Sequence, residues 1–78
     1  MSNIESLRIT VNNVNRLMAE LTGSEYPRIR TATSYGTRRI YLDEENNPVK
    51  CFPPRGPKEC LMFAEGMEEA LKTVKYGR

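Results

Sequence analysis

The chain has 78 residues, of which 38% are hydrophobic and 28% charged, and its formal net charge at pH 7 is +2. A chain of this length is expected to form one small domain, residues 1–78, that buries only about 60% of its unfolded surface. No apolar run approaches the ~20 residues that cross a membrane, and the opening MSNIESLRIT does not resemble a signal peptide. We therefore expect a cytoplasmic protein with no membrane partner.

Residues 3–22 have the spacing of an amphipathic helix. Ser2 and Glu5 have the spacing of a capping box, and Gly23 suits the left-handed residue that ends a helix. The apolar stripe of this helix comprises Ile4, Leu7, Val11, Val14, Met18 and Leu21. The same spacing fits the a and d positions of a coiled coil, so a dimer seam is an alternative to packing within the domain. We favour packing within the domain.

The pattern then changes to short β-type runs that are separated by turn residues. We predict strands at about 26–33, 38–42 and 49–52. Tyr35-Gly36 is predicted to be the two-residue loop of the first hairpin, because glycine accepts the positive φ that such loops need. The run DEENNP, residues 43–48, is predicted to form the second turn.

A second helix is predicted at about 57–75, after the proline-rich loop PPRGP at residues 53–57. Pro57 suits the first turn of a helix, where a missing N–H is harmless. The apolar stripe of this helix comprises Cys60, Phe63, Ala64, Met67, Leu71 and Val74. Gly66 costs about 1 kcal/mol relative to alanine inside a helix, which indicates a close approach to the sheet or to a partner.

The order α-β-β-β-α predicts an α+β fold, a three-stranded antiparallel meander with both helices packed on one face. A two-residue loop at 35–36 sets the pairing of the first two strands, and burial of Ile29, Ile40 and Leu42 towards the helices agrees with it. The predicted pairs are Thr33 with Arg38, Thr31 with Ile40, Ile29 with Leu42, Leu42 with Val49, and Ile40 with Cys51.

By alternation, the face away from the helices is predicted to be basic and aromatic. The residues assigned to it are Arg28, Arg30, Arg39, Tyr41, Lys50 and Phe52. Residues 26–42 contain four arginines and no acid, whereas acids gather at 43–45 and in the last third of the chain. Such a face can bind phosphates while its rings stack on bases, which indicates nucleic acid or a nucleotide. The alternative is an ordinary solvated face whose long charged side chains keep the sheet soluble.

Catalytic and metal-binding patterns are missing from the sequence. It contains no histidine and no glycine-rich phosphate loop, and Ser34 and Cys51 have no visible orienting partner. We therefore expect a protein that is not an enzyme and has no cofactor and no metal site. Cys51 and Cys60 are too few for a disulfide framework, and we predict two reduced, half-buried thiols, with a disulfide as the alternative.

Two short motifs are similar to pieces of small uncharacterised accessory proteins of tailed bacteriophages and prophages. Ser34-Tyr35-Gly36-Thr37 resembles their Y-G-G-like hairpin tip, with Thr37 in place of the second glycine. Lys58-Glu59-Cys60-Leu61 resembles the [KR]-x-E-[CL] opening of their closing helix, without the residue between the lysine and the glutamate. Phe63, Ala64 and Gly66 extend the likeness, which covers roughly residues 26–70. The resemblance implies an accessory protein of the host cytoplasm that acts by binding a host or defence protein, a nucleotide signal or nucleic acid.

Two functions follow as hypotheses. The first is a small non-enzymatic binding protein that engages an anionic partner, nucleic acid or a nucleotide, through the basic-aromatic face. The alternative is a protein-interaction module, either a homo-oligomer or an inhibitor of a host or defence protein, that acts through an amphipathic helix.

Overall fold

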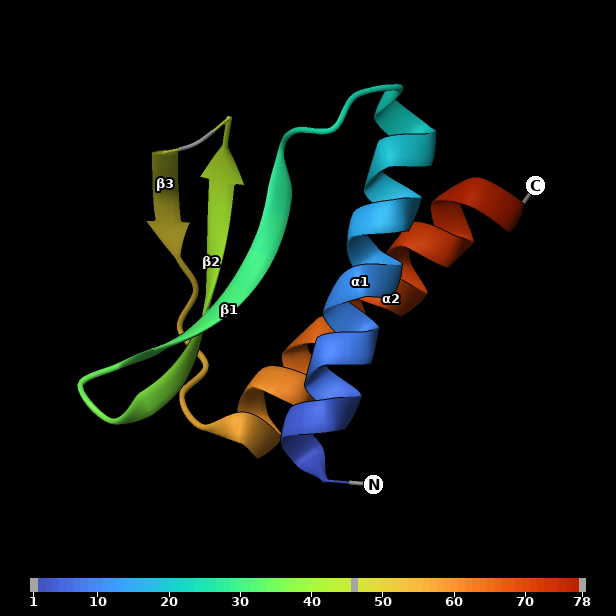
Figure 1. Cartoon of the computed structure of the whole chain (residues 1–78). Coiled ribbons are helices and arrows are strands. Elements are labelled where there is room, and N and C mark those ends of the chain that lie inside the picture. The colour runs from blue at the N-terminus through green and yellow to red at the C-terminus, as the bar shows by residue number, and fades with distance from the viewer. Residues whose placement is uncertain (1, 46, 78) are drawn as a thin grey trace.

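The structure is a computed structural model that describes residues 2–45 and 47–77. Its elements are α1 (Asn3–Thr22), β1 (Arg28–Ser34), β2 (Thr37–Glu44), β3 (Asn47–Cys51) and α2 (Pro57–Tyr76). The strands form one antiparallel sheet in the order β1-β2-β3, and both helices lie on one side of it (Figure 1). The predicted α+β meander is confirmed. The strands differ from their predicted bounds mainly because β2 and β3 reach closer to their connecting turn.

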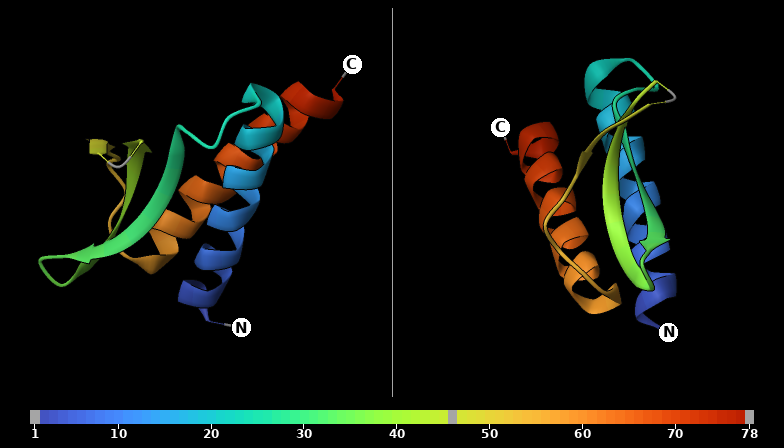
Figure 2. Two further views of the ribbon diagram at one scale, coloured as in Figure 1. Left: turned by 45° about the horizontal axis from the view of Figure 1, so that its top comes forward. Right: turned by 90° about the vertical axis from the view of Figure 1, so that its left-hand side faces the viewer.

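The two helices lie side by side and begin at the same end of the molecule (Figure 2). The Ser2 hydroxyl accepts a hydrogen bond from the Glu5 amide at 3.1 Å, which caps the start of α1 as expected. Gly23 ends α1 in the left-handed conformation, with φ of 72°. An ion pair between Glu20 and Lys75 joins the C-terminal ends of the two helices.

The hydrophobic core lies between the helices and the sheet. Its buried members are Leu7, Val11, Val14, Ile29, Ile40, Cys60 and Ala64. Leu7 and Val14 have no exposed surface at all, so the stripe of α1 is used within the domain. It is therefore not available as the seam of a coiled-coil dimer.

The predicted stripes are wrong at their ends. Ile4 and Leu21 of α1 and Val74 of α2 are exposed, whereas Leu17, which was not predicted, is buried. Burial on α1 runs only from Leu7 to Leu17. An α-helix has 3.6 residues per turn, so a stripe with alternating steps of three and four residues turns slowly around the helix. Its end residues therefore face away from the surface that covers its middle. Gly66 does not mark a close approach to the sheet, since a Cβ atom there would meet nothing within 4 Å.

One side chain of α1 pairs with the outer edge of β1. The Asn15 carboxamide donates a hydrogen bond from Nδ2 to the Ile29 carbonyl at 2.8 Å, and its Oδ1 accepts one from the Ile29 amide at 2.7 Å. The side chain thus satisfies both backbone groups that a neighbouring strand would otherwise pair. This contact fixes α1 against the sheet and occupies the outer edge of β1 at Ile29.

Replacement of Asn15 should destabilise the fold more than replacement of a neighbouring asparagine. Asn15→Ala leaves the Ile29 amide and carbonyl without their partner, which should lower the free energy of unfolding by about 1–3 kcal/mol. Asn12→Ala is the matched control, because Asn12 is exposed on the same helix and gains the same helix propensity. Urea denaturation measures the free energy of unfolding of each variant. Equal stabilities for the two variants would contradict the role of Asn15.

The pairing of β1 with β2 is confirmed, including Ile29 with Leu42 and Thr33 with Arg38. The pairing of β2 with β3 keeps the predicted register only next to their turn, at Asp43 with Pro48. The register then shifts, and Val49 stands as an extra residue in β3. Beyond this bulge Lys50 pairs with Leu42 and Cys51 with Tyr41, so the predicted pairs Leu42–Val49 and Ile40–Cys51 are wrong.

The bulge exchanges the faces of the residues that follow it, because side chains alternate along a strand. Phe52 turns towards the helices, where its ring centroid lies 5.1 Å from that of Phe63. Its amide donates to the Ile40 carbonyl at 2.9 Å and continues the ladder past the end of β3. Burial of a phenylalanine contributes about 1.5–3 kcal/mol, which accounts for a bulge that directs this ring inward.

The two cysteines are unpaired, and they differ sharply in exposure. Cys51 is exposed on the outer face and Cys60 is fully buried, so the prediction of two half-buried thiols is wrong. The Cys60 thiol donates to the Arg38 carbonyl, with a sulfur–oxygen distance of 3.4 Å. Burial raises the pKa of the Cys60 thiol above its usual value, because it disfavours the thiolate.

Only one thiol should react in the native protein. The Cys51 thiol should be modified at once by an aromatic disulfide reagent at mildly alkaline pH, whereas Cys60 is buried and its raised pKa lowers the thiolate fraction. The Cys60 thiol should react only after addition of denaturant. Cys51→Ser should abolish the fast reaction, and two equally fast thiols in the native protein would contradict this assignment.

A basic hollow on the outer face of the sheet

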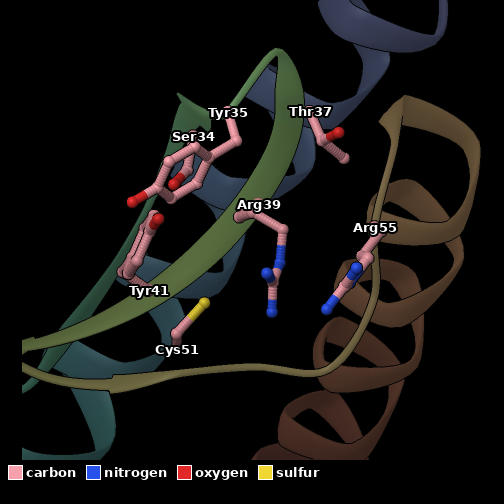
Figure 3. Close-up of a pocket in the computed structure, with 7 residues that line it drawn as sticks. All are labelled: Ser34, Tyr35, Thr37, Arg39, Tyr41, Cys51 and Arg55. Carbon is pink, nitrogen blue, oxygen red and sulfur yellow. The ribbon is translucent and has the colours of Figure 1, made fainter.

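The β1–β2 hairpin ends in a tip that projects beyond the helices (Figure 1). From this tip a hollow of about 450 Å³ extends along the outer face, the face of the sheet away from the helices. Its lining residues, drawn in Figure 3, are Ser34, Tyr35, Thr37, Arg39, Tyr41, Cys51 and Arg55. Two of them are arginines and none is an acid. The hollow therefore combines positive charge with hydroxyl groups and aromatic rings.

Two of the six predicted binding residues, Arg39 and Tyr41, line the hollow. Arg28 and Arg30 are also on the outer face, opposite Asp43 and Tyr41 of β2, but they do not line it. They lie nearer the other end of the hairpin. The structure thus divides the predicted basic face into two parts.

The other two predicted residues, Lys50 and Phe52, are not on the outer face. The bulge at Val49 directs both towards the helix side, where the Lys50 ammonium lies 5.3 Å from the centre of the Phe52 ring. Phe52 packs against the core and is not accessible as a stacking platform on the predicted face. Their predicted placement is therefore wrong, and the cause is the register shift.

The arginines of β1 are paired with acids. Arg30 Nε donates to Asp43 Oδ2 at 2.7 Å, and the Arg30 guanidinium lies 4.7 Å from the centre of the Tyr41 ring. Arg28 Nη1 lies 3.6 Å from Glu25 Oε1. These acids balance the charge of β1, and the Arg30 guanidinium covers part of the Tyr41 ring.

Arg39 is held in place by the backbone of the loop after β3. Its Nη2 donates to the Phe52 carbonyl at 2.8 Å and its Nε to the Pro54 carbonyl at 3.1 Å. A guanidinium carries five N–H donors in a rigid plane, so these two bonds orient the group and leave others for a ligand. Arg39 thus serves the fold while it brings charge to the hollow.

Arg55 was missed by the sequence-based prediction. It lies in the proline-rich loop, and the next residue, Gly56, donates its amide to the Arg38 carbonyl at 2.9 Å. This bond and the flanking prolines restrain the loop beside β2, so that Arg55 reaches the hollow near Arg39 (Figure 3). The available signal was a single charged residue within PPRGP, in a segment that otherwise lacks a functional group.

Tyr35 was also missed, because it was assigned only to the turn. Tyr35 and Gly36 both have positive φ, 51° and 74°, as in the type I′ loops that favour asparagine, aspartate or glycine. A tyrosine in this conformation costs about 1–2 kcal/mol. Its ring is fully exposed and lies with Ser34 and Tyr41 on one side of the hollow, whereas the arginines lie on the other (Figure 3). The sequence did contain a signal for Tyr35, because a tyrosine is unfavourable at this turn position.

This set of groups suits the binding of an anion more than chemistry on it. Guanidinium groups and hydroxyls donate hydrogen bonds to phosphate oxygens, and rings stack on flat apolar groups. Among residues 2–45 and 47–77, no three Cys, Asp or Glu side chains are grouped so that they could hold a metal ion. No helix of this described part is long and apolar enough to cross a membrane.

No family model matches the chain, and no curated protein or solved structure matches it either. The likeness to bacteriophage accessory proteins therefore stays a prediction. A functional proposal depends on the geometry of the hollow.

The two arginines of the hollow should differ in their effect on stability. Arg39→Gln removes the hydrogen bonds to the Phe52 and Pro54 carbonyls and should lower the free energy of unfolding by about 1–3 kcal/mol. Arg55→Gln changes an exposed side chain and should stay within about 0.5 kcal/mol of the parent protein. Urea denaturation tests the difference, and an equal loss in both variants would show that Arg39 does not hold the loop.

Proposed function

We propose that this chain is a small non-enzymatic binding protein, of the accessory kind found in bacteriophages and prophages. Its ligand carries a phosphate, as a nucleotide or as nucleic acid, and occupies the hollow between Arg39 and Arg55. The observation that carries this proposal is a lining with two arginines and no carboxylate. Host cytoplasm is the compartment in which such a protein would meet this ligand.

Electrostatics support an anion at this place. Arg39 and Arg55 bring two positive charges to one hollow, and they repel each other until an anion lies between them. Guanidinium groups match phosphate geometry with paired hydrogen bonds, and charge-assisted bonds of this kind are about twice as strong as neutral ones. The hydroxyls of Ser34 and Thr37 add uncharged donors around the same space.

The rings support a ligand that is more than a bare anion. Tyr35 and Tyr41 lie on the side of the hollow opposite the arginines, where a base attached to the phosphate can reach them (Figure 3). Stacking of a base on an aromatic side chain is worth about 1–3 kcal/mol and tolerates different bases. A base-bearing phosphate therefore uses both sides of the hollow.

The alternative function, protein interaction through a helix, has less support. The middle of the α1 stripe, from Leu7 to Leu17, is buried within the domain and cannot contact a partner without unfolding. The exposed apolar side chains of α2, such as Met62, Val74 and Tyr76, are spread along the helix. Single exposed apolar residues are normal on protein surfaces and need no partner. We therefore favour the hollow.

Arg55→Gln should weaken binding by about 10- to 100-fold, because it removes a charge-assisted contact with the ligand. The ligands to test are fluorescently labelled nucleoside monophosphates and a short labelled single-stranded oligonucleotide, and fluorescence anisotropy at about 50 mM salt reports the affinity. Arg28→Gln is the matched control. It removes the same charge from the same face outside the hollow, so it should change affinity by less than about 3-fold.

Two results would overturn the proposal. One is the absence of binding to any of these phosphates at low salt. The other is an equal loss of affinity in both variants, which would show general attraction to a basic surface in place of a site between Arg39 and Arg55.

A further inference from the structure

Two arginines of the outer face, Arg39 and Arg55, line the hollow, and the other two have acidic partners outside it. Arg28 and Arg30 are each paired with an acid of the same region, Glu25 and Asp43. In the described part of the chain, no acid forms an ion pair with Arg39 or Arg55. A nucleic acid strand needs a row of cations that follows its phosphates, and here such a row would have only two members.

At the far end of the same hairpin, the acids outnumber the two arginines, Arg28 and Arg30, with which two of them pair. Asp43 and Glu44 end β2, Glu45 follows them, and Glu25 precedes β1. A strand that left the hollow along β2 would bring its next phosphates towards these carboxylates, and like charges repel. A ligand that ends within the hollow avoids this repulsion.

The size of the hollow fits a single small ligand. Its volume of about 450 Å³ lies in the range of about 300–1,000 Å³ that is typical of small-molecule sites. Guanidinium groups lie on one side of it and rings on the other, so both ends of one nucleotide can be contacted together (Figure 3).

Tyr35 adds an independent observation. It occupies a turn position that asparagine or glycine would stabilise, and its ring is fully exposed. The ring therefore makes no visible contribution to the core, although its backbone conformation is strained. Strain of this kind at a site is typical of residues that serve binding in place of stability. Tyr41 is less free to stack, because the Arg30 guanidinium lies over its ring.

We infer that the ligand is a single nucleotide, with its phosphate between Arg39 and Arg55 and its base against Tyr35. This inference rests on the proposed function and narrows it, because it excludes a nucleic acid strand as the preferred ligand. The protein then acts as a receptor or a sink for a mononucleotide.

Tyr35→Asn separates the role of the ring from the stability of the turn. Asparagine is favoured at this position, so the variant should unfold at the same or a higher urea concentration than the parent protein. Its affinity for nucleoside monophosphates should fall by about 10-fold, since one base contact is lost. Its affinity for ribose 5-phosphate should not change, because that ligand keeps the phosphate and lacks the base. Urea denaturation measures the stability of the variant, and isothermal titration calorimetry measures its two affinities.

The size of the ligand is tested by comparison with a single-stranded oligonucleotide. Each nucleotide of the oligonucleotide offers one way of occupying the hollow. The affinity of the oligonucleotide should therefore exceed that of a nucleoside monophosphate by no more than a factor equal to its number of nucleotides. Its affinity should fall with salt no more steeply than two phosphate contacts require, a slope of about −1.4 in a plot of log K against log salt concentration.

The outcomes distinguish this inference from the proposed function. Tight oligonucleotide binding with a steeper slope would overturn the inference and leave phosphate binding at the hollow intact. Full nucleotide affinity in Tyr35→Asn would also overturn it, since the ring would then have no role. A failure of nucleotides, ribose 5-phosphate and the oligonucleotide to bind at all would overturn the proposed function as well.

Discussion

The extra residue in β3, Val49, determines which side chains the outer face presents. Because of it, Phe52 turns inward onto Phe63 while Cys51 turns outward into the hollow. The buried ring anchors the segment that follows, and the carbonyls of that segment hold the Arg39 guanidinium. Without the bulge, Phe52 would lie on the outer face and the loop that carries Arg55 would lose its anchor. A single backbone irregularity thus links core packing to the geometry of the site.

The parts of the fold that follow from sequence are those that local rules control. Helix α1 follows from periodicity and its two caps, and the β1–β2 register follows from a two-residue loop together with alternation at Ile29 and Ile40. The β2–β3 register could not be obtained in this way. It depends on whether Phe52 or Val49 packs under the helices, and that competition is decided by contacts with α2, which lie outside the strand pattern itself.

The candidate site was predicted in part for the same reason. Alternation placed Arg28, Arg30, Arg39 and Tyr41 on one face correctly, but it says nothing about ion pairs that cross between strands, such as Arg30 with Asp43. Tyr35 and Arg55 left signals in the sequence that the prediction of the face did not use. One is an unfavourable residue at a turn, and the other is a charged residue among prolines.

The two interpretations of the basic face, a solvated surface and a proposed binding site, are supported by different residues. Arg28 and Arg30 have acidic partners and are partly exposed, as expected for a face whose charges keep an open sheet soluble. Arg39 and Arg55 lie where no acid lines the space between them, in a hollow whose other side is lined by the strained and exposed Tyr35. A turn that served only to connect β1 and β2 would be more stable with asparagine in place of Tyr35. The proposed binding site therefore differs from the rest of the face in two features, its unpaired charge and its strained tyrosine. The number of arginines does not separate the two parts of the face.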